Sequence, residues 1–159
     1  MAAVVAAAVL HAQAPAMGRE AGAKIQDFVR EAIADRFQAG DIPDMNLLRD
    51  RSHVYVSREL PSDSVQLTER ALPNIPDSRF ELISFAELSA MAARTRSDVF
   101  YIAVDSPRIE QESATISLGV DFVAASKETL KMCCCSGRGE FRRTESRWAF
   151  VKWISMTCS

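Results

Sequence analysis

The chain has 159 residues, of which 48% are hydrophobic and 25% are charged, and its formal net charge is −2. This length and composition are typical of one soluble domain with a single core, and they leave little room for a second domain. With a net charge so close to zero, the chain has no overall electrostatic field that would attract it to nucleic acid or to an anionic membrane.

The N-terminal segment differs from this average composition. Residues 2–10, AAVVAAAVL, are wholly apolar, and the A-x-A pattern of residues 12–14 follows them. This order is typical of a secretory signal peptide, and the run is shorter than the ~20 apolar residues that span a bilayer. No Lys or Arg precedes the run, so an alanine-rich extension is the alternative. We expect residues 1–16 to be a signal peptide and residues 17–159 to be a single domain, exported to the periplasm or secreted, with no membrane insertion after cleavage.

An amphipathic helix is predicted from Arg19 to Ala39. Its apolar residues recur at the spacing of one helical face and are Ile25, Phe28, Val29, Ala32, Ile33 and Phe37. Charged residues occupy the other face, and Gly40 stands where a helix stop is expected. Such a helix needs an apolar surface to lie on. Residues 41–50 can hold a short helical turn before the first strand.

Residues 51–57, RSHVYVS, alternate in the manner of a half-buried strand. Val54 and Val56 share one face, whereas His53 and Tyr55 share the other. Further along the chain, residues 80–83 are apolar enough for either a short strand or an apolar plug.

Ser84 and Glu87 form a capping-box pattern, in which each side chain caps a backbone N–H near the start of a helix. The helix that follows should end near Ser97. Strands are then predicted over residues 98–105 and 113–123, joined by a hairpin turn at 108–112.

The C-terminal part adds a strand at residues 139–143 and a last strand, WAFVKWIS, after a turn at residues 144–147. The element order predicts an α+β fold. In it, the N-terminal amphipathic helix and the short second helix pack on one face of a curved antiparallel sheet, a meander.

This order, with the ending GRGEFRRTESRWAFVKW, resembles the ketosteroid-isomerase-like (nuclear-transport-factor-like) family, which has a cone fold. In that family N-terminal helices cover a strongly bent sheet, and the last hairpin often carries an aromatic-Arg…Trp pattern. The resemblance covers residues 20–156, and the chain also resembles uncharacterised exported bacterial proteins. Because the family includes isomerases, dehydratases, ligand binders and scaffolds, the resemblance leaves the function open. No position matches a catalytic motif of its enzymes.

The cysteines are the unusual feature of the sequence, because Cys133, Cys134 and Cys135 are adjacent and Cys158 stands apart. A structural zinc site needs paired Cys or His ligands, and adjacent strand residues point to opposite faces. A redox centre would need Cys-x-x-Cys at a helix N-terminus. The spacing therefore indicates no metal site and no cofactor. Buried thiols are favoured over a disulfide to Cys158, and both over a reactive thiol.

The surrounding residues predict a hairpin. Residues 130–135 should form a strand paired antiparallel with residues 139–144, with the turn at residues 136–138 because its glycines can take positive φ. Alternation then makes Cys134 the most buried thiol.

Two sets of candidate site residues follow from the predicted strands. His53, Tyr55 and Asp121 have the side chains of a base and its partners in proton transfer, and each can equally well face solvent. They are the catalytic candidates if the protein is an enzyme.

The last hairpin supplies the candidate ligand-binding residues. In the last strand Trp148, Phe150 and Ile154 alternate onto one face, and Val151 and Trp153 onto the other. An apolar residue on both faces indicates a covered strand, a pocket or an interface. The predicted ligand-binding residues are Trp148, Phe150, Trp153 and Arg143. Basic residues also cluster here, for an anionic ligand or as a solvated hairpin, at Arg138, Arg142, Arg143, Arg147 and Lys152.

The sequence thus favours an exported domain that is not an enzyme and binds a small apolar or anionic ligand, or a partner protein, through its curved sheet. One alternative is a cone-fold enzyme that catalyses proton transfer, as isomerases and dehydratases do. The other is a homodimeric structural protein whose sheets pack together.

Overall fold

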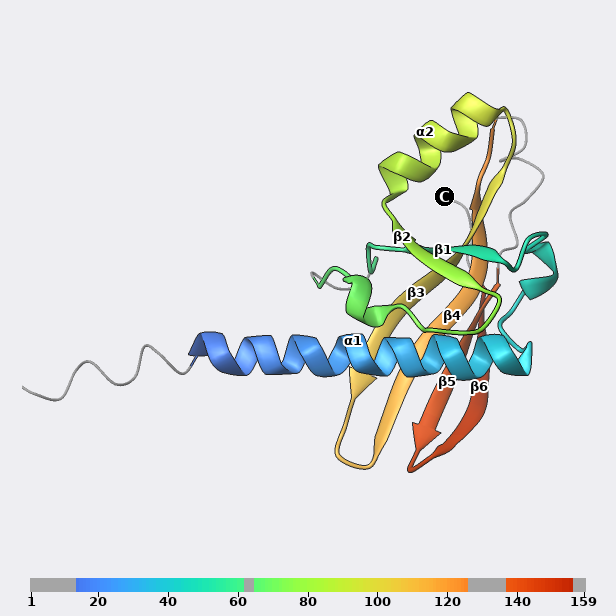
Figure 1. The fold of residues 1–159 in the computed structure, drawn as a ribbon. Coiled ribbons are helices and arrows are strands. Elements are labelled where there is room, and N and C mark those ends of the chain that lie inside the picture. Colours follow the sequence, from blue (N-terminus) through green and yellow to red (C-terminus); the bar gives the residue numbers. More distant parts are fainter. Residues whose placement is uncertain (1–13, 62–64, 126–136, 156–159) are drawn as a thin grey trace, which may run out of the picture.

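The computed structural model describes residues 14–61, 65–125 and 137–155. Its helices are α1 (Ala14–Ala39) and α2 (Phe85–Thr95), with two short 3₁₀ turns, η1 (Met45–Leu47) and η2 (Glu69–Ala71). Its strands are β1 (His53–Ser57), β2 (Arg79–Ile83), β3 (Val99–Ile109), β4 (Ser113–Val123), β5 (Gly137–Thr144) and β6 (Arg147–Ser155). The six strands form one curved sheet that α1 crosses (Figure 1), so the predicted α+β fold is confirmed.

The strand order is β2-β1-β3-β4-β5-β6. From β3 to β6 the sheet is the predicted antiparallel meander, but β1 pairs in parallel with both β2 and β3. Parallel neighbours need long crossover connections, and the chain provides residues 58–78 before β2 and α2 after it. The fully antiparallel sheet was therefore wrong at this edge.

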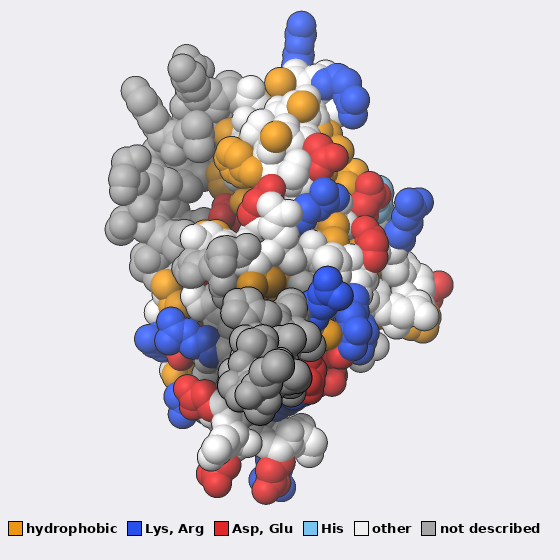
Figure 2. Space-filling model, turned by 90° about the vertical axis from the view of Figure 1, so that its left-hand side faces the viewer, with side chains coloured by type: hydrophobic (Ala, Val, Ile, Leu, Met, Phe, Trp, Pro, Cys, Tyr) orange, Lys and Arg blue, Asp and Glu red, His pale blue; other side chains and the backbone are white. Residues whose placement is uncertain are grey.

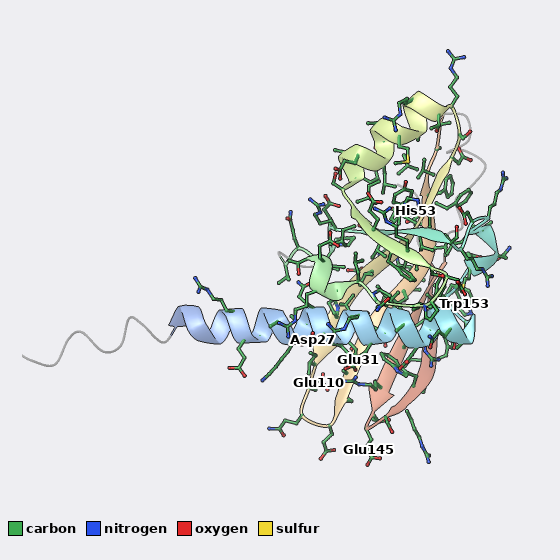
Figure 3. The ribbon with its side chains drawn as sticks, in the orientation of Figure 1. Asp27, Glu31, His53, Glu110, Glu145 and Trp153 are labelled. Atoms are coloured by element: carbon green, nitrogen blue, oxygen red, sulfur yellow. The ribbon has the colours of Figure 1, made fainter. Side chains whose placement is uncertain are left out.

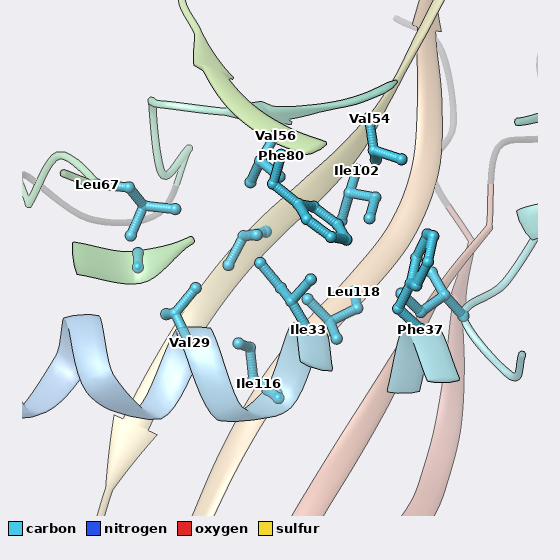
Figure 4. Close-up of a cluster of buried hydrophobic side chains, with 14 of the residues drawn as sticks. Val29, Ile33, Phe37, Val54, Val56, Leu67, Phe80, Ile102, Ile116 and Leu118 are labelled. Carbon is cyan, nitrogen blue, oxygen red and sulfur yellow. The ribbon is translucent and has the colours of Figure 1, made fainter. Parts of the chain in front are cut away.

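The predicted apolar face of α1 is its buried face. Val29, Ile33 and Phe37 point from the helix into the core against β-strand residues such as Ile116 and Leu118 (Figure 4). The helix ends at Ala39, and Gly40 follows with φ of 73°, a left-handed conformation that glycine adopts without strain. The helix begins at Ala14, before the predicted Arg19.

The two helices cover opposite faces of the sheet, which corrects the expectation of one covered face. Val54, Val56, Ile102 and Val104 belong to the cluster under α1, and we call their side of the sheet the α1 face. A second cluster, which we call the α2 face, joins α2 to alternate strand residues and contains Ile83, Leu88, Ala92, Val99, Tyr101 and Ala103. Strand β3 is apolar on both sides, so each of its faces needs a cover.

The capping box at the start of α2 is present as predicted. The Ser84 hydroxyl accepts from the Glu87 backbone N–H at 3.2 Å, and the Ser84 N–H donates to the Glu87 carboxylate at 2.8 Å. These bonds satisfy donors that the first helical turn leaves free. The hydrogen bonds that the Ser84 N–H and hydroxyl donate to the Glu87 carboxylate also hold the pKa of that carboxyl below its usual value.

The predicted hairpin, in which residues 130–135 pair with residues 139–144, was wrong. Strand β5 pairs with β4 on one side, from Ser113↔Thr144 to Leu118↔Gly139, and with β6 on the other. Described strands therefore occupy both edges of β5. Gly137 and Arg138, placed in a turn by the sequence, lie within β5. The four cysteines lie outside the described residues.

Two strands carry one extra residue each. In β3 the register shifts between Asp105 and Arg108, and in β6 Val151 has no partner on β5 because Lys152 pairs with Glu140 and Phe150 pairs with Phe141. Each extra residue is a β-bulge, which reverses the alternation of the residues beyond it. Trp153 therefore lies on the same face as Trp148 and Phe150, and Ile154 lies opposite, which corrects the predicted faces.

Candidate functional site

A groove of about 510 Å³ runs along β4 on the α2 face. It is lined by Asp105, Ser106, Arg108, Glu110, Ser113, Thr115, Ile116, Ser117, Glu140, Arg142, Lys152 and Ile154. The groove exists because β4 has small residues on this face, Ser113, Thr115, Ser117 and Gly119, whereas the strands beside it carry long side chains. Its floor is therefore rich in hydroxyl groups.

Register places the charged side chains in rows across the groove. Thr115 pairs with Arg108 on β3 and with Arg142 on β5, so one hydroxyl lies between two arginines. In the next row Ser117 pairs with Asp105 on one side and Glu140 on the other. Neighbouring strands are ~4.8 Å apart, so the two arginines start about 10 Å apart.

The bulges determine which cations face the groove. Regular alternation from Asp105 would place Arg108 on the α1 face, and regular alternation from Trp148 would place Lys152 there. The extra residue in each strand turns both cations onto the α2 face instead. In the β3 bulge Ser106 has φ of 48°, an uncommon left-handed conformation for a residue other than glycine.

The two arginines differ from the lysine in their partners. Lys152 Nζ lies 3.7 Å from the Glu140 carboxylate. Neither Arg108 nor Arg142 forms an ion pair or a hydrogen bond with any residue of the described chain, and both are exposed. The row of Thr115 therefore holds two positive charges that no carboxylate offsets.

A cluster of polar side chains lies next to the groove on the α2 face and shares Asp105 with it. We call it the Arg138 cluster: Tyr101, Asp105, Asp121 and Arg138. The Arg138 side chain is 7% exposed, and its terminal nitrogens lie 3.4 Å from the Asp105 carboxylate and 3.6 Å from the Asp121 carboxylate. Burial and the nearby Asp121 carboxylate raise the pKa of the Tyr101 phenol to about 12.

Gly119 makes this cluster possible. A Cβ atom at Gly119 would lie 3.1 Å from Cγ of Arg138 and 2.7 Å from the carbonyl oxygen of Gly137. The arginine side chain thus passes over the bare backbone of β4 to reach Asp105 on β3. A larger residue here would push β5 or its arginine away.

The three predicted catalytic residues share the α2 face but do not meet. His53 Nε2 lies 2.9 Å from Glu81, and its ring centroid is 4.8 Å from that of Tyr55 (His53 is labelled in Figure 3). Asp121 pairs with Tyr101 on β3. Because β3 lies between β1 and β4, Tyr101 separates Asp121 from Tyr55.

The predicted ligand-binding residues share the α1 face, opposite the groove, and two of them hold α1 on the sheet. The Trp148 ring stacks on Phe28 at 5.7 Å, and its Nε1 donates to the Asp35 carboxylate at 2.7 Å. Arg143 forms an ion pair with Glu31 and lies over the Phe28 ring.

The other two predicted residues, Phe150 and Trp153, are 49% and 60% exposed. Trp153, near the end of β6 and away from the β5–β6 turn at Glu145, is labelled in Figure 3. Unlike Trp148 and Arg143, they remain available to a partner.

Comparison with known proteins gives no assignment: no protein-family model, curated protein or solved structure matches the chain. The resemblance to the ketosteroid-isomerase-like family therefore stays a prediction. Among the described residues, no three His, Cys, Asp or Glu side chains are grouped as metal ligands. In the same part of the chain, no helix has the length and apolarity to cross a bilayer.

The formal net charge of the chain is small, at −2. On the face that Figure 2 presents, acidic and basic side chains are interspersed. Local pairs of unneutralised cations, as at Arg108 and Arg142, are therefore more informative than the net charge. Sequence reasoning noted Arg142 and Lys152 as basic residues, but it missed Arg108 and Thr115, because only the register brings them into one row.

Proposed function

We propose that the protein binds a small anionic ligand, through a carboxylate or phosphate group, in the groove between Arg108 and Arg142. The ligand's anionic group would lie over Thr115, whose hydroxyl can donate to it. The planar guanidinium groups suit this task because each offers paired N–H donors to two oxygens of one anion.

The observation that supports this proposal is the pair of β-bulges. Bulges are over-represented next to functional sites, where they redirect a side chain. Here each of two strands bears one, and each turns a cation onto the same groove, Arg108 from β3 and Lys152 from β6.

The groove also has the form that a polar ligand needs. The ion pair between Arg138 and Asp105 borders the groove, and the hydroxyls of Thr115 and Ser117 line its floor. Two of the three acidic residues of the groove are engaged with cations, Asp105 with Arg138 and Glu140 with Lys152, and the third, Glu110, accepts a hydrogen bond from the Ser113 hydroxyl. Among the described residues, the charged side chains of the groove that have no partner are Arg108 and Arg142, so the groove favours an anion. Export, as the N-terminal pattern predicts, is part of the proposal, and the ligand would then be met outside the cytoplasm.

Titration with inorganic phosphate and with citrate tests the proposal, with NMR observation of the arginine Nε–H signals. Saturable shifts are expected at Arg108 and Arg142. The variants Arg108→Gln and Arg142→Gln should each weaken binding about tenfold or more, because a hydrogen bond to a charged group contributes ~1.5–3 kcal/mol.

The matched control is Arg94→Gln on α2, an exposed arginine that also forms no ion pair with the described residues. It should leave binding unchanged. If the three variants weaken binding equally, the anions are attracted by charge alone, and the groove is not a site. Shifts that never saturate would also end the proposal.

A further inference from the structure

Strand β6 lies at the edge of the sheet, and no strand of the described chain pairs with its outer side. It runs over nine residues, from Arg147 to Ser155. An edge of this length presents a row of unpaired backbone N–H and C=O groups, which is a template for strand addition.

The bulge at Val151 gives this edge two chemically distinct faces. On the α1 face β6 presents the aromatic side chains Trp148, Phe150 and Trp153. On the α2 face it presents Arg147, Ala149, Lys152 and Ile154. No acidic residue occurs between Arg147 and Ser155. The edge therefore carries three aromatic residues on one side and two cations, beside Ala149 and Ile154, on the other.

The exposed aromatic rings are held in place before any partner arrives. The Trp153 ring lies over Gly137, where an added Cβ would come within 2.6 Å of it. Phe150 contacts Trp153 edge-on at 6.0 Å between ring centroids and Phe141 at 5.7 Å. Rings that are already ordered lose little conformational freedom on binding, which favours affinity.

We propose that the β6 edge binds an extended segment of a partner protein, in which apolar residues alternate with Asp or Glu. Backbone pairing would add the segment as a seventh strand. Its apolar side chains would pack on Phe150 and Trp153, and its carboxylates would meet Arg147 and Lys152 on the other face. Period-two alternation is what a strand needs to address both faces.

Charge complementarity selects this occupant over a second copy of the chain. If two β6 edges paired antiparallel, Arg147 and Lys152 of each copy would face a strand with the same positive charges. Like charges across a strand pair are destabilising, and edge lysines commonly prevent self-association. An acidic segment gains from the same residues.

An eight-residue peptide of alternating Val and Glu, labelled for fluorescence anisotropy, tests the inference with the full chain. Trp153→Ala should weaken binding at least tenfold, whereas Phe85→Ala, an equally exposed aromatic on α2, should not change it. N-methylation of alternate peptide amides along one edge should abolish binding, since it removes the donors that pair with β6.

A charge exchange gives the sharpest outcome. The substitution Lys152→Glu should weaken binding of the acidic peptide at least fivefold. The same variant should bind a peptide with Lys in place of Glu more tightly than the native chain does. Equal losses of affinity in Trp153→Ala and Phe85→Ala would overturn the inference. It would also be overturned if the peptide still bound whichever of its two edges was N-methylated. A dimer in light scattering that Trp153→Ala dissociates would likewise overturn it, because a second copy would then occupy the edge. Circular dichroism confirms that each variant is folded.

Discussion

The substitution Gly119→Ala should destabilise the protein by about 2 kcal/mol, because the new Cβ atom meets backbone. It would lie 2.7 Å from the Gly137 carbonyl oxygen and 3.1 Å from Arg138 Cγ. Overpacking by one methyl group costs ~1–3 kcal/mol, and the upper end applies because a strand carbonyl cannot rotate away as a side chain does. Alanine also has less conformational entropy than glycine in the unfolded chain, which offsets ~0.5–1 kcal/mol of this loss of stability.

Urea unfolding of Gly119→Ala and Gly22→Ala, each against the native chain, measures the effect. Gly22 lies in α1 with nothing within 4 Å of its added Cβ, so alanine there should stabilise by ~0.5–1 kcal/mol through helix propensity. The loss at Gly119 corresponds to a fall in Tm of roughly 4–8 °C for a chain of this size. A Gly119→Ala protein as stable as the native chain would refute the close approach of β5 and Arg138 to β4.

Two further predictions concern ionisation. A hydrogen bond from Arg70 holds the pKa of Asp27 below its ordinary value of 3.8, so the stability from this pair is present above that value and is lost as the pH falls through the lowered pKa. Arg70→Gln should flatten the acid limb of stability against pH, and an unchanged limb would contradict the pairing. In Tyr55→Phe, Tyr101 is the one remaining tyrosine, and its phenolate absorbance should appear near pH 12. Titration near pH 10 in a protein with native circular dichroism would show that Tyr101 is not buried.

The helices and strands with strong local signals could be predicted from the sequence. The period of α1, the Gly40 stop, the Ser84–Glu87 box and the alternation of β1 are each local, so neighbouring residues suffice to predict them. The partners of the strands were less predictable. The sequence pattern of β2 and β1 does not distinguish parallel from antiparallel pairing. The hairpin expected at residues 130–144 was wrong because β4 and β6 pair with the two edges of β5.

The candidate groove could not be predicted because it depends on register. A bulge is one extra residue in a strand, and Val151 belongs to no residue type that signals one. Pro107 in the β3 bulge is such a signal, because proline inside a sheet is confined to edges and bulges, but it does not show which residues the bulge brings into one row. Reading through each bulge with strict alternation reverses every later side chain. For this reason the sequence placed Trp153 opposite Phe150, although the two rings are in contact. Arg142 and Lys152 were recognised as basic, but the pairing of Arg108 with Thr115 joins residues from two strands.

One extra residue in β6 produces both proposed surfaces. Before Val151 the strand places Trp148 and Phe150 on the α1 face, and regular alternation would add Lys152 to them and send Trp153 to the groove. The aromatic side of the edge would then contain a charge, and the groove would lose a cation and gain an indole ring. With the bulge, the three aromatic residues of the strand lie on one face and its two cations on the other. The separation of aromatic residues from cations on β6 therefore depends on the bulge, in which Val151 has no partner on β5.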